Sequence, residues 1–199
     1  MSYAIKSIND LGLISDVEKH CKALALADAI LMPEWEYRYF SFNSNWDGCK
    51  QEMMASMRDG SGGEYFIHFT SEGVAGKVFY KELLPDPSNE LLLVPDKFAA
   101  FKVEPAFSLD KASFFFWKEK DESSWKASPS NLREYPLLGF LLGGVDRYHC
   151  WAESYYERKI DLTVLKEVFS TLSITADQLS TLNPDIELGD LDEDLQEIL

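Results

Sequence analysis

Apolar residues near the start of the chain recur at the spacing of a helix. Val17, Cys21 and Leu24 lie three or four positions apart, which predicts an amphipathic helix. Residues 15–18, Ser-Asp-Val-Glu, have the pattern of a capping box, so we expect the helix to begin there. Pro33 should end it, because proline lacks the backbone N–H that a helix needs.

After position 33 the apolar period changes from helical to alternating. In EWEYRYFSF, Trp35, Tyr37 and Tyr39 occupy every second position, and aromatic residues at this period favour a strand. Other alternating or wholly apolar runs predict strands at 52–57, 64–70, 74–80, 112–118 and 137–142. Short connections favour antiparallel neighbours. The pattern therefore predicts a central, mostly antiparallel sheet of about six strands.

The C-terminal third is helical in pattern. Tyr148, Trp151 and Tyr155 share one face of a helix, and Asp161 is a suitable N-cap for the next one. Residues 175–178, Thr-Ala-Asp-Gln, form a second capping box. Together the segments predict a single α+β domain over residues 1–184, in which the N-terminal helix and a C-terminal helical segment pack on the sheet. The polar run 120–133 is expected to be an exposed loop.

Residues 185–199, DIELGDLDEDLQEIL, form an acidic C-terminal tail without any lysine or arginine. The tail keeps spaced apolar residues that a solvated acidic segment would not need. Two interpretations stay open, a disordered tail and a docked amphipathic segment. The apolar positions are Ile186, Leu188, Leu191, Leu195, Ile198 and Leu199.

Charge narrows the classes of partner. The 199-residue chain has a formal net charge of −15. Its hydrophobic residues make up 46% of the sequence, which is enough to form a core. Phosphate-binding surfaces need clustered Lys and Arg, so this composition argues against nucleic acid and anionic membranes as partners. It favours a basic protein partner, with the oligomeric state left open.

Three cysteines, Cys21, Cys49 and Cys150, are an odd number in a chain too large to need disulfides. Reduced thiols fit a cytoplasmic protein best. The first residues lack the pattern of a signal peptide, and the longest apolar run, 137–144, is far too short to span a bilayer.

The run Asp59-Gly60-Ser61-Gly62-Gly63 invites three interpretations. Ser61 lacks the G-x-S-x-G spacing of a nucleophile elbow, and His68 lies about 20 Å further along a strand. A phosphate cradle would be expected to lead into a helix, and here a strand follows. Glycines that accept positive φ, next to an Asp that can bond downstream amides, favour a simple hairpin turn.

No other constellation points clearly to chemistry. The His-Cys pairs at 20–21 and 149–150 are adjacent on predicted helices, which is unlike the spacing of zinc ligands, so no metal and no cofactor are predicted. No carboxylate pair stands out as a general acid and base, so no catalytic residue is assigned. The residues that we nominate for binding are Asp59, Ser61, Glu64, Trp151 and Tyr155.

The segment 57–81, MRDGSGGEYFIHFTSEGVAGKVFYK, resembles the centre of the SUKH superfamily. The shared features are a strand, an Asp-Gly-Ser-Gly turn, an aromatic-rich strand, a short turn and a strand that ends in paired aromatics. These are small α+β domains, and many of them are bacterial immunity proteins that bind and neutralise toxins. The resemblance covers about an eighth of the chain, and it implies binding instead of catalysis.

Three functional hypotheses follow, and the simplest is a structural or regulatory domain whose acidic tail docks on the domain itself. The first is a non-catalytic, acidic protein-binding domain of bacterial type, with an immunity protein that neutralises a basic toxin as its specific form. The alternative is a hydrolase-like enzyme whose site is assembled around His68, Asp59 and Glu64, with His149 as a further candidate. A pocket that holds two or more of these side chains within hydrogen-bond reach would favour the enzyme.

Overall fold

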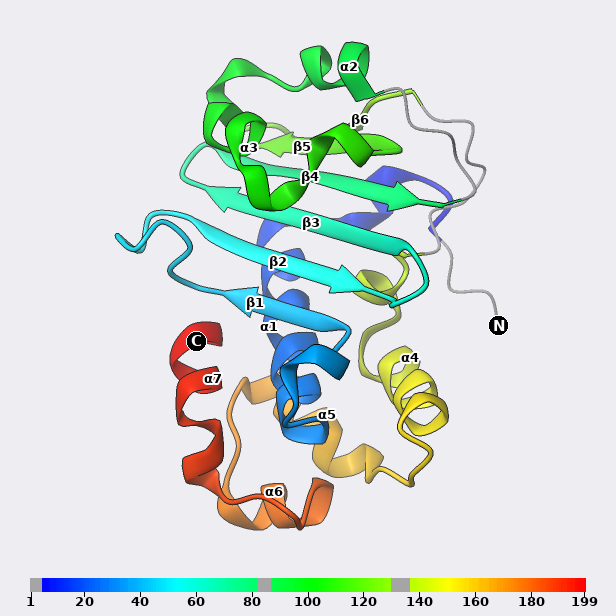
Figure 1. Ribbon diagram of the computed structural model, residues 1–199, viewed down its shortest axis with the longest axis vertical. Helices are drawn as coiled ribbons and strands as arrows, with labels where there is room; N and C mark the ends of the chain where they lie inside the picture. The colour runs from blue at the N-terminus through cyan, green and yellow to red at the C-terminus, as the bar shows by residue number, and fades with distance from the viewer. Residues whose placement is uncertain (1–4, 82–86, 130–136) are drawn as a thin grey trace.

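A six-stranded antiparallel sheet forms the centre of the computed structural model, which describes residues 5–81, 87–129 and 137–199 (Figure 1). The strands pair in sequence order from one edge to the other, so the sheet is a simple meander. This confirms the predicted α+β fold. The strands are β1 Phe40–Asn43, β2 Met53–Arg58, β3 Gly63–Thr70, β4 Gly73–Tyr80, β5 Phe114–Glu119 and β6 Lys126–Ala127.

The predicted N-terminal helix, α1, runs from Ile14 to Leu31 behind the sheet, and further helices gather around it beyond the β1 edge (Figure 1). Every residue from 23 to 31 is buried, so the second half of α1 is enclosed on all sides, as its apolar composition requires. The enclosing helices are α4 Phe140–Tyr155, α5 Leu162–Thr171, α6 Ala176–Leu182 and α7 Asp192–Ile198.

Short helices cover the opposite face of the sheet (Figure 1). The segment after Pro95 is helical and buries both Phe98 and Phe101. These elements are α2 Pro87–Glu90 and α3 Ala99–Val103, with 3-10 turns at Leu91–Leu93, Asp96–Phe98, Pro105–Phe107 and Leu109–Lys111. Further 3-10 turns are Ile8–Leu11, Trp35–Tyr37 and Leu188–Leu191.

The central strands are buried on both faces, and side chains therefore enter two separate cores. On β3, Tyr65 and Ile67 face α1, whereas Phe66 and His68 face the short helices. The second core is rich in phenylalanine, including Phe101, Phe107 and Phe115. Burial of such a side chain contributes about 1.5–3 kcal/mol. The α1 side and the short-helix side both stabilise the sheet.

Asp28 connects α1 to the first strand and to α4. Its Oδ2 accepts hydrogen bonds from the backbone amides of Tyr39 and Phe40, at 2.8 and 2.9 Å. Its Oδ1 accepts from the hydroxyls of Tyr148 and Tyr156, at 2.6 and 3.0 Å. Burial raises the pKa of Asp28 to about 6, although the four donors oppose this shift.

The start of EWEYRYFSF is not a strand, contrary to the alternating pattern. Trp35–Tyr37 form a 3-10 turn, and β1 begins only at Phe40. The Arg38 side chain donates to the carbonyl oxygens of Met32 and Pro33, at 2.6 and 2.7 Å, and so holds the chain in a bend after α1. The alternation instead leaves Trp35 and Tyr37 exposed on the surface.

The predicted strand at 137–142 is also wrong, because α4 begins at Phe140. Leu137, Leu138, Phe140 and Leu141 are buried, which is a helical spacing, and a short apolar run cannot distinguish the two structures. The sixth strand is β6 at 126–127, inside the run expected to be an exposed loop, and Trp125 beside it is buried. Positions 130–133 of that expected loop lie outside the described residues.

The predicted helix caps differ in outcome. Residues 15–18 do not form a capping box, because α1 already begins at Ile14 and Leu13 is its N-cap. Asp161 caps α5 as expected, accepting from the amides of Thr163 and Val164. The Thr175–Gln178 capping box of α6 is also present.

The acidic segment 185–199 is folded onto the domain and carries α7. Leu191 and Ile198 are buried in the core that contains α1. Near the edge strand, the amide of Ser44 donates to the carbonyl oxygen of Glu197 at 2.7 Å. The apolar positions in this segment are therefore those of a docked helix. None of the helices in the described ranges is both long and apolar enough to cross a bilayer.

Candidate binding site

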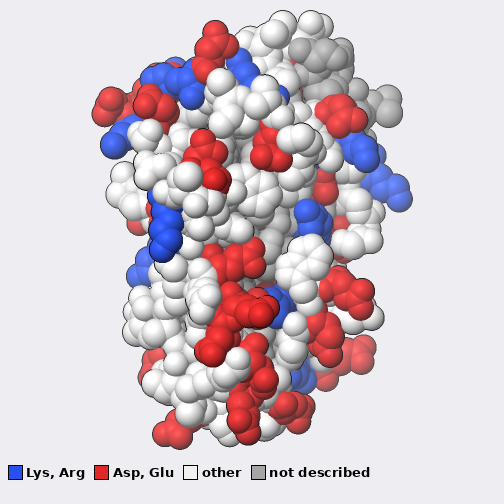
Figure 2. Space-filling model, turned by 60° about the vertical axis from the view of Figure 1, so that its left-hand side comes forward, with Lys and Arg blue, Asp and Glu red and all other residues white. Residues whose placement is uncertain are grey.

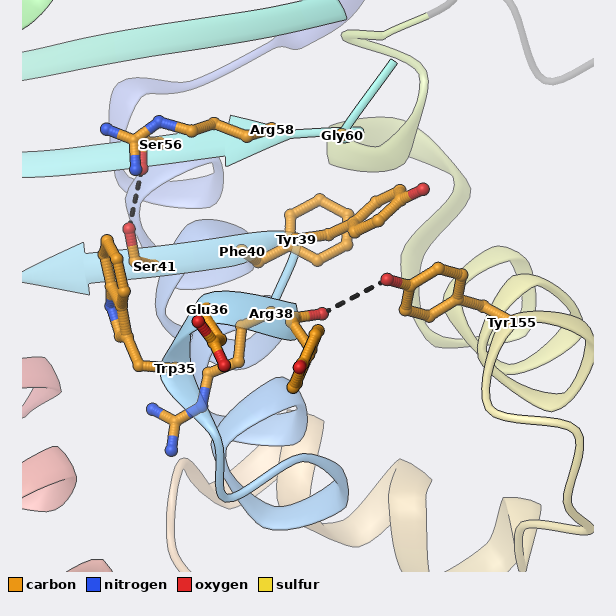
Figure 3. A pocket seen from close by; sticks show the side chains of 11 residues that line it. Trp35, Glu36, Arg38, Tyr39, Phe40, Ser41, Ser56, Arg58, Gly60 and Tyr155 are labelled. Atoms are coloured by element: carbon orange, nitrogen blue, oxygen red, sulfur yellow. Dashed lines mark hydrogen bonds between the residues drawn. The ribbon is translucent and has the colours of Figure 1, made fainter.

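A hollow of about 210 Å³ lies on the uncovered part of the sheet, beside the beginning of β1 (Figure 3). Its walls come from three parts of the chain that are distant in sequence: the bend before β1, the end of β2 and the last turn of α4. We call it the edge pocket. Its lining residues are Trp35, Glu36, Tyr37, Arg38, Tyr39, Phe40, Ser41, Ser56, Arg58, Gly60 and Tyr155.

Exposed aromatic rings surround the edge pocket. Trp35, Tyr37 and Tyr155 are 59%, 53% and 40% exposed. Behind the rim, the Trp151 ring stacks on that of Tyr155, with centroids 5.2 Å apart and an angle of 13°. Tyr39 contacts both rings at centroid distances of 4.6 Å. This packing holds the Tyr155 ring in place before a partner binds, which lowers the entropic cost of binding.

Trp151 and Tyr155 were nominated for binding, and the structure places Tyr155 at the edge pocket, with Trp151 packed against it. Tyr155 lines it, and its hydroxyl donates to the backbone carbonyl of Tyr37 at 3.4 Å. Trp151 is half-buried and supports Tyr155 from behind. Of the two, only Tyr155 is free to contact a partner directly.

The glycine-rich run makes the hairpin turn between β2 and β3, next to the edge pocket. Asp59 Oδ1 accepts from the amides of Ser61 and Gly63, both at 2.8 Å. Gly60 and Gly62 have φ values of 67° and 106°, which glycine adopts without strain. A side chain at position 63 would place its Cβ 2.3 Å from Asp59 Oδ2. Turn geometry therefore accounts for these residues, and Ser61 is an exposed part of the turn.

Glu64, another nominated residue, forms an ion pair on β3. Its Oε1 accepts from Lys77 Nζ at 2.6 Å, and the Lys77 side chain is fully buried. Burial lowers the pKa of Lys77, whereas the hydrogen bond to Glu64 opposes that shift. Glu64 thus compensates a buried charge, which is a structural role.

The residues of the alternative enzyme hypothesis have different partners in different places. His68 is buried and contacts Glu52 at 2.9 Å, and burial lowers the pKa of its imidazole. His149 contacts the backbone carbonyl of Ile160 at 2.8 Å. With Asp59 bonded to its turn and Glu64 to Lys77, each side chain is engaged separately. Among the described residues, no group of three or more His, Cys, Asp or Glu is arranged as metal ligands.

Three charged side chains border the edge pocket. Arg38 donates to both carboxylate oxygens of Asp194 in α7, at 2.5 and 3.0 Å. Glu36 raises the pKa of the Tyr37 hydroxyl, mainly through its negative charge and also through a hydrogen bond. Arg58 lies over two aromatic faces, 5.1 Å from the Phe66 ring centroid and 5.9 Å from that of Trp35.

An acidic surface adjoins the edge pocket. Trp35 and Arg38 also border a second depression, whose other side is formed by Asp194 and Glu197 of α7. Figure 2 shows acidic side chains gathered over the lower half of this side of the molecule. We call the exposed carboxylates of the C-terminal segment the acidic face; they belong to Asp185, Glu187, Asp190, Asp192, Glu193 and Glu197.

Trp35, Tyr37 and Arg58 line the edge pocket but were not among the residues nominated from the sequence. Trp35 and Tyr37 were assigned to a strand, and strand aromatics are usually part of a core. The signal that could have identified them is Pro33 just before the run, because a proline at the end of a helix favours a bend over an immediate strand.

Residues 57–81 fold as parts of β2, β3 and β4 joined by tight turns, an arrangement common to antiparallel meanders. The SUKH resemblance therefore stays a prediction. Comparison of the chain with family models, with curated proteins and with solved structures gives no match.

Proposed function

We propose that this protein is a non-catalytic, acidic protein-binding domain of bacterial type that acts in the cytoplasm. Its partner is a basic protein, and its specific role is that of an immunity protein that neutralises a toxin. The observation that supports this most strongly is the position of the exposed aromatic rim, directly beside the acidic face.

The two surfaces would act at different stages of binding. The carboxylates of the acidic face attract a basic partner over distances of about 10 Å, the screening length at ordinary salt concentrations. Trp35, Tyr37 and Tyr155 would then supply the buried contacts, because Trp and Tyr residues are over-represented among interface residues that dominate affinity. Attraction sets the association rate, and the aromatic contacts set the dissociation rate.

Association kinetics test the electrostatic part of the proposal. The full chain serves as bait to capture the partner from its source cell, and mass spectrometry identifies it. We expect the association rate constant of the purified pair to fall at least about tenfold from low to high ionic strength. A rate constant that does not change with salt would refute capture by charge.

Two matched double variants test whether the acidic face is the part of the surface that attracts the partner. Neutralising Asp192 and Glu193 on α7, as Asp192→Asn and Glu193→Gln, should slow association several-fold. Neutralising the exposed Glu72 and Asp121 in loops outside the acidic face removes the same charge and should slow it less. Equal effects would mean that net charge alone matters, and not the acidic face.

Growth tests the toxin part separately. The captured partner should arrest growth when it is expressed alone and should not when this chain is co-expressed. A harmless partner that still binds with strong salt dependence would leave the binding proposal standing and exclude the immunity role.

A further inference from the structure

Among the described residues that line the edge pocket, Arg58 is a cation without an ion pair, whereas the nearby carboxylates keep their charge but are engaged by other donors. Glu36 is bonded to Tyr37, Asp59 to the amides of its turn, and Glu64 to Lys77. Arg38 is compensated by Asp194. Arg58, although exposed, forms no ion pair within the part of the chain that the structure describes, and its guanidinium lies over the rings of Phe66 and Trp35.

Arg58 is held in a defined position over a pair of hydroxyl groups. Its side chain runs back along β2, so that the guanidinium lies near Ser56 and Ser41, with Trp35 beyond them (Figure 3). Ser41 Oγ and Ser56 Oγ are 2.6 Å apart, and one hydroxyl hydrogen suffices for that contact. The second hydroxyl hydrogen is left to donate elsewhere. The site thus offers guanidinium and hydroxyl donors next to an apolar indole.

The size of the edge pocket indicates the size of its ligand. Its volume of about 210 Å³ is below the roughly 300–1,000 Å³ of sites for small organic ligands. A single side chain of a protein partner fits such a space better than a cofactor does. A cationic side chain would meet the uncompensated Arg58, whereas a carboxylate would find there the forked donor geometry that arginine provides.

We propose that the edge pocket binds one carboxylate side chain, an Asp or Glu, of the protein partner. Arg58 donates to the carboxylate, one hydroxyl of the Ser41–Ser56 pair donates to it as well, and Trp35 covers the stem of the side chain. This inference rests on the proposed function and names the central contact of that interface.

The combination would make recognition selective. The acidic face repels a generally acidic protein before its carboxylate can reach Arg58. A generally basic protein is attracted, but only one with a carboxylate at the matching place satisfies Arg58 in the complex. Naturally specific interfaces often combine a repulsive and an attractive element in this way.

A titration followed by amide NMR tests the site without the partner. Sodium benzoate, benzamidine and inorganic phosphate are each added to the ¹⁵N-labelled full chain. We expect benzoate alone to shift the indole N–H of Trp35 and the amides of Ser41 and Ser56, with a saturating dependence on concentration. Preferential binding of benzamidine or of phosphate would overturn the carboxylate assignment, and so would no binding at all.

Variants connect the shifts to Arg58. Arg58→Met keeps much of the stem but removes the charge, and it should weaken benzoate binding at least about tenfold. Arg58→Lys should restore only part of the affinity, because lysine lacks the planar fork. Lys120→Met removes a positive charge that is also exposed, outside the edge pocket, and should leave the affinity unchanged. Equal losses in Arg58→Met and Lys120→Met would refute the proposal.

The dispersion of the amide spectrum shows in each case that the variant is folded. Failure of benzoate to bind would contradict the carboxylate contact but not the salt-dependent capture by the acidic face. An association rate without salt dependence would contradict that capture but not the carboxylate contact.

Discussion

At the scale of single residues, Asp28 should make the stability of the fold depend on pH. Its pKa of about 6 in the folded chain lies about two units above the ordinary value of 3.8. The protonated form is thus favoured by folding. Its contribution is complete below about pH 4 and is lost as the pH rises through 6, by about 3 kcal/mol in total. We expect Asp28→Asn, which cannot ionise, to lack this component.

The measurement for Asp28 is the free energy of unfolding in denaturant, for both proteins, from about pH 4 to about pH 7. The difference between wild type and variant should shift by about 2–3 kcal/mol in favour of Asp28→Asn over that range. A difference that stays constant would mean that the four donors hold the pKa of Asp28 near its ordinary value. Comparison of two proteins at each pH cancels the titration of the other carboxyl groups.

At the scale of elements, α7 should contribute to the stability of the fold as well as to its negative charge. Deleting residues 185–199 removes buried Leu191 and Ile198, at about 1.5–3 kcal/mol each, and leaves Arg38 without Asp194. We expect Tm to fall by about 10 °C. Glu193→Gln, an exposed change in the same helix, should leave Tm nearly unchanged. An unaltered Tm after the deletion would mean that the docked helix adds nothing to stability.

At the scale of the whole molecule, a net charge of −15 should make the fold more stable in salt. Like charges repel within the folded chain, and ions screen that repulsion. We expect Tm to rise by several degrees between about 0.01 and about 0.15 M sodium chloride. Potassium chloride should act equally if screening is the cause. A Tm that falls with salt would show that the ion pairs, such as Lys77 with Glu64, outweigh the repulsion.

Sequence patterns predicted the meander, α1 and the helical C-terminal region because each depends on local period and turn chemistry. The hydrogen bond of Asp59 within its own turn and the helix cap at Asp161 were also predictable, because each involves only neighbouring residues. The edge pocket was not predictable in this way. Tyr37 and Tyr155 meet across 118 positions of sequence, and only the packing of α4 against the β1 side brings them together.

The enclosure of α1 has a consequence for how the protein is made. On the ribosome, α1 emerges early, whereas the helices that surround it, α4 to α7, belong to the last part of the chain, residues 140–199. A nascent chain that has completed the sheet still presents the bare apolar sides of α1 to its surroundings. Final closure must wait until residues 140–199 have been synthesised, and a chain that terminates before them keeps an exposed apolar surface that chaperones and proteases can recognise.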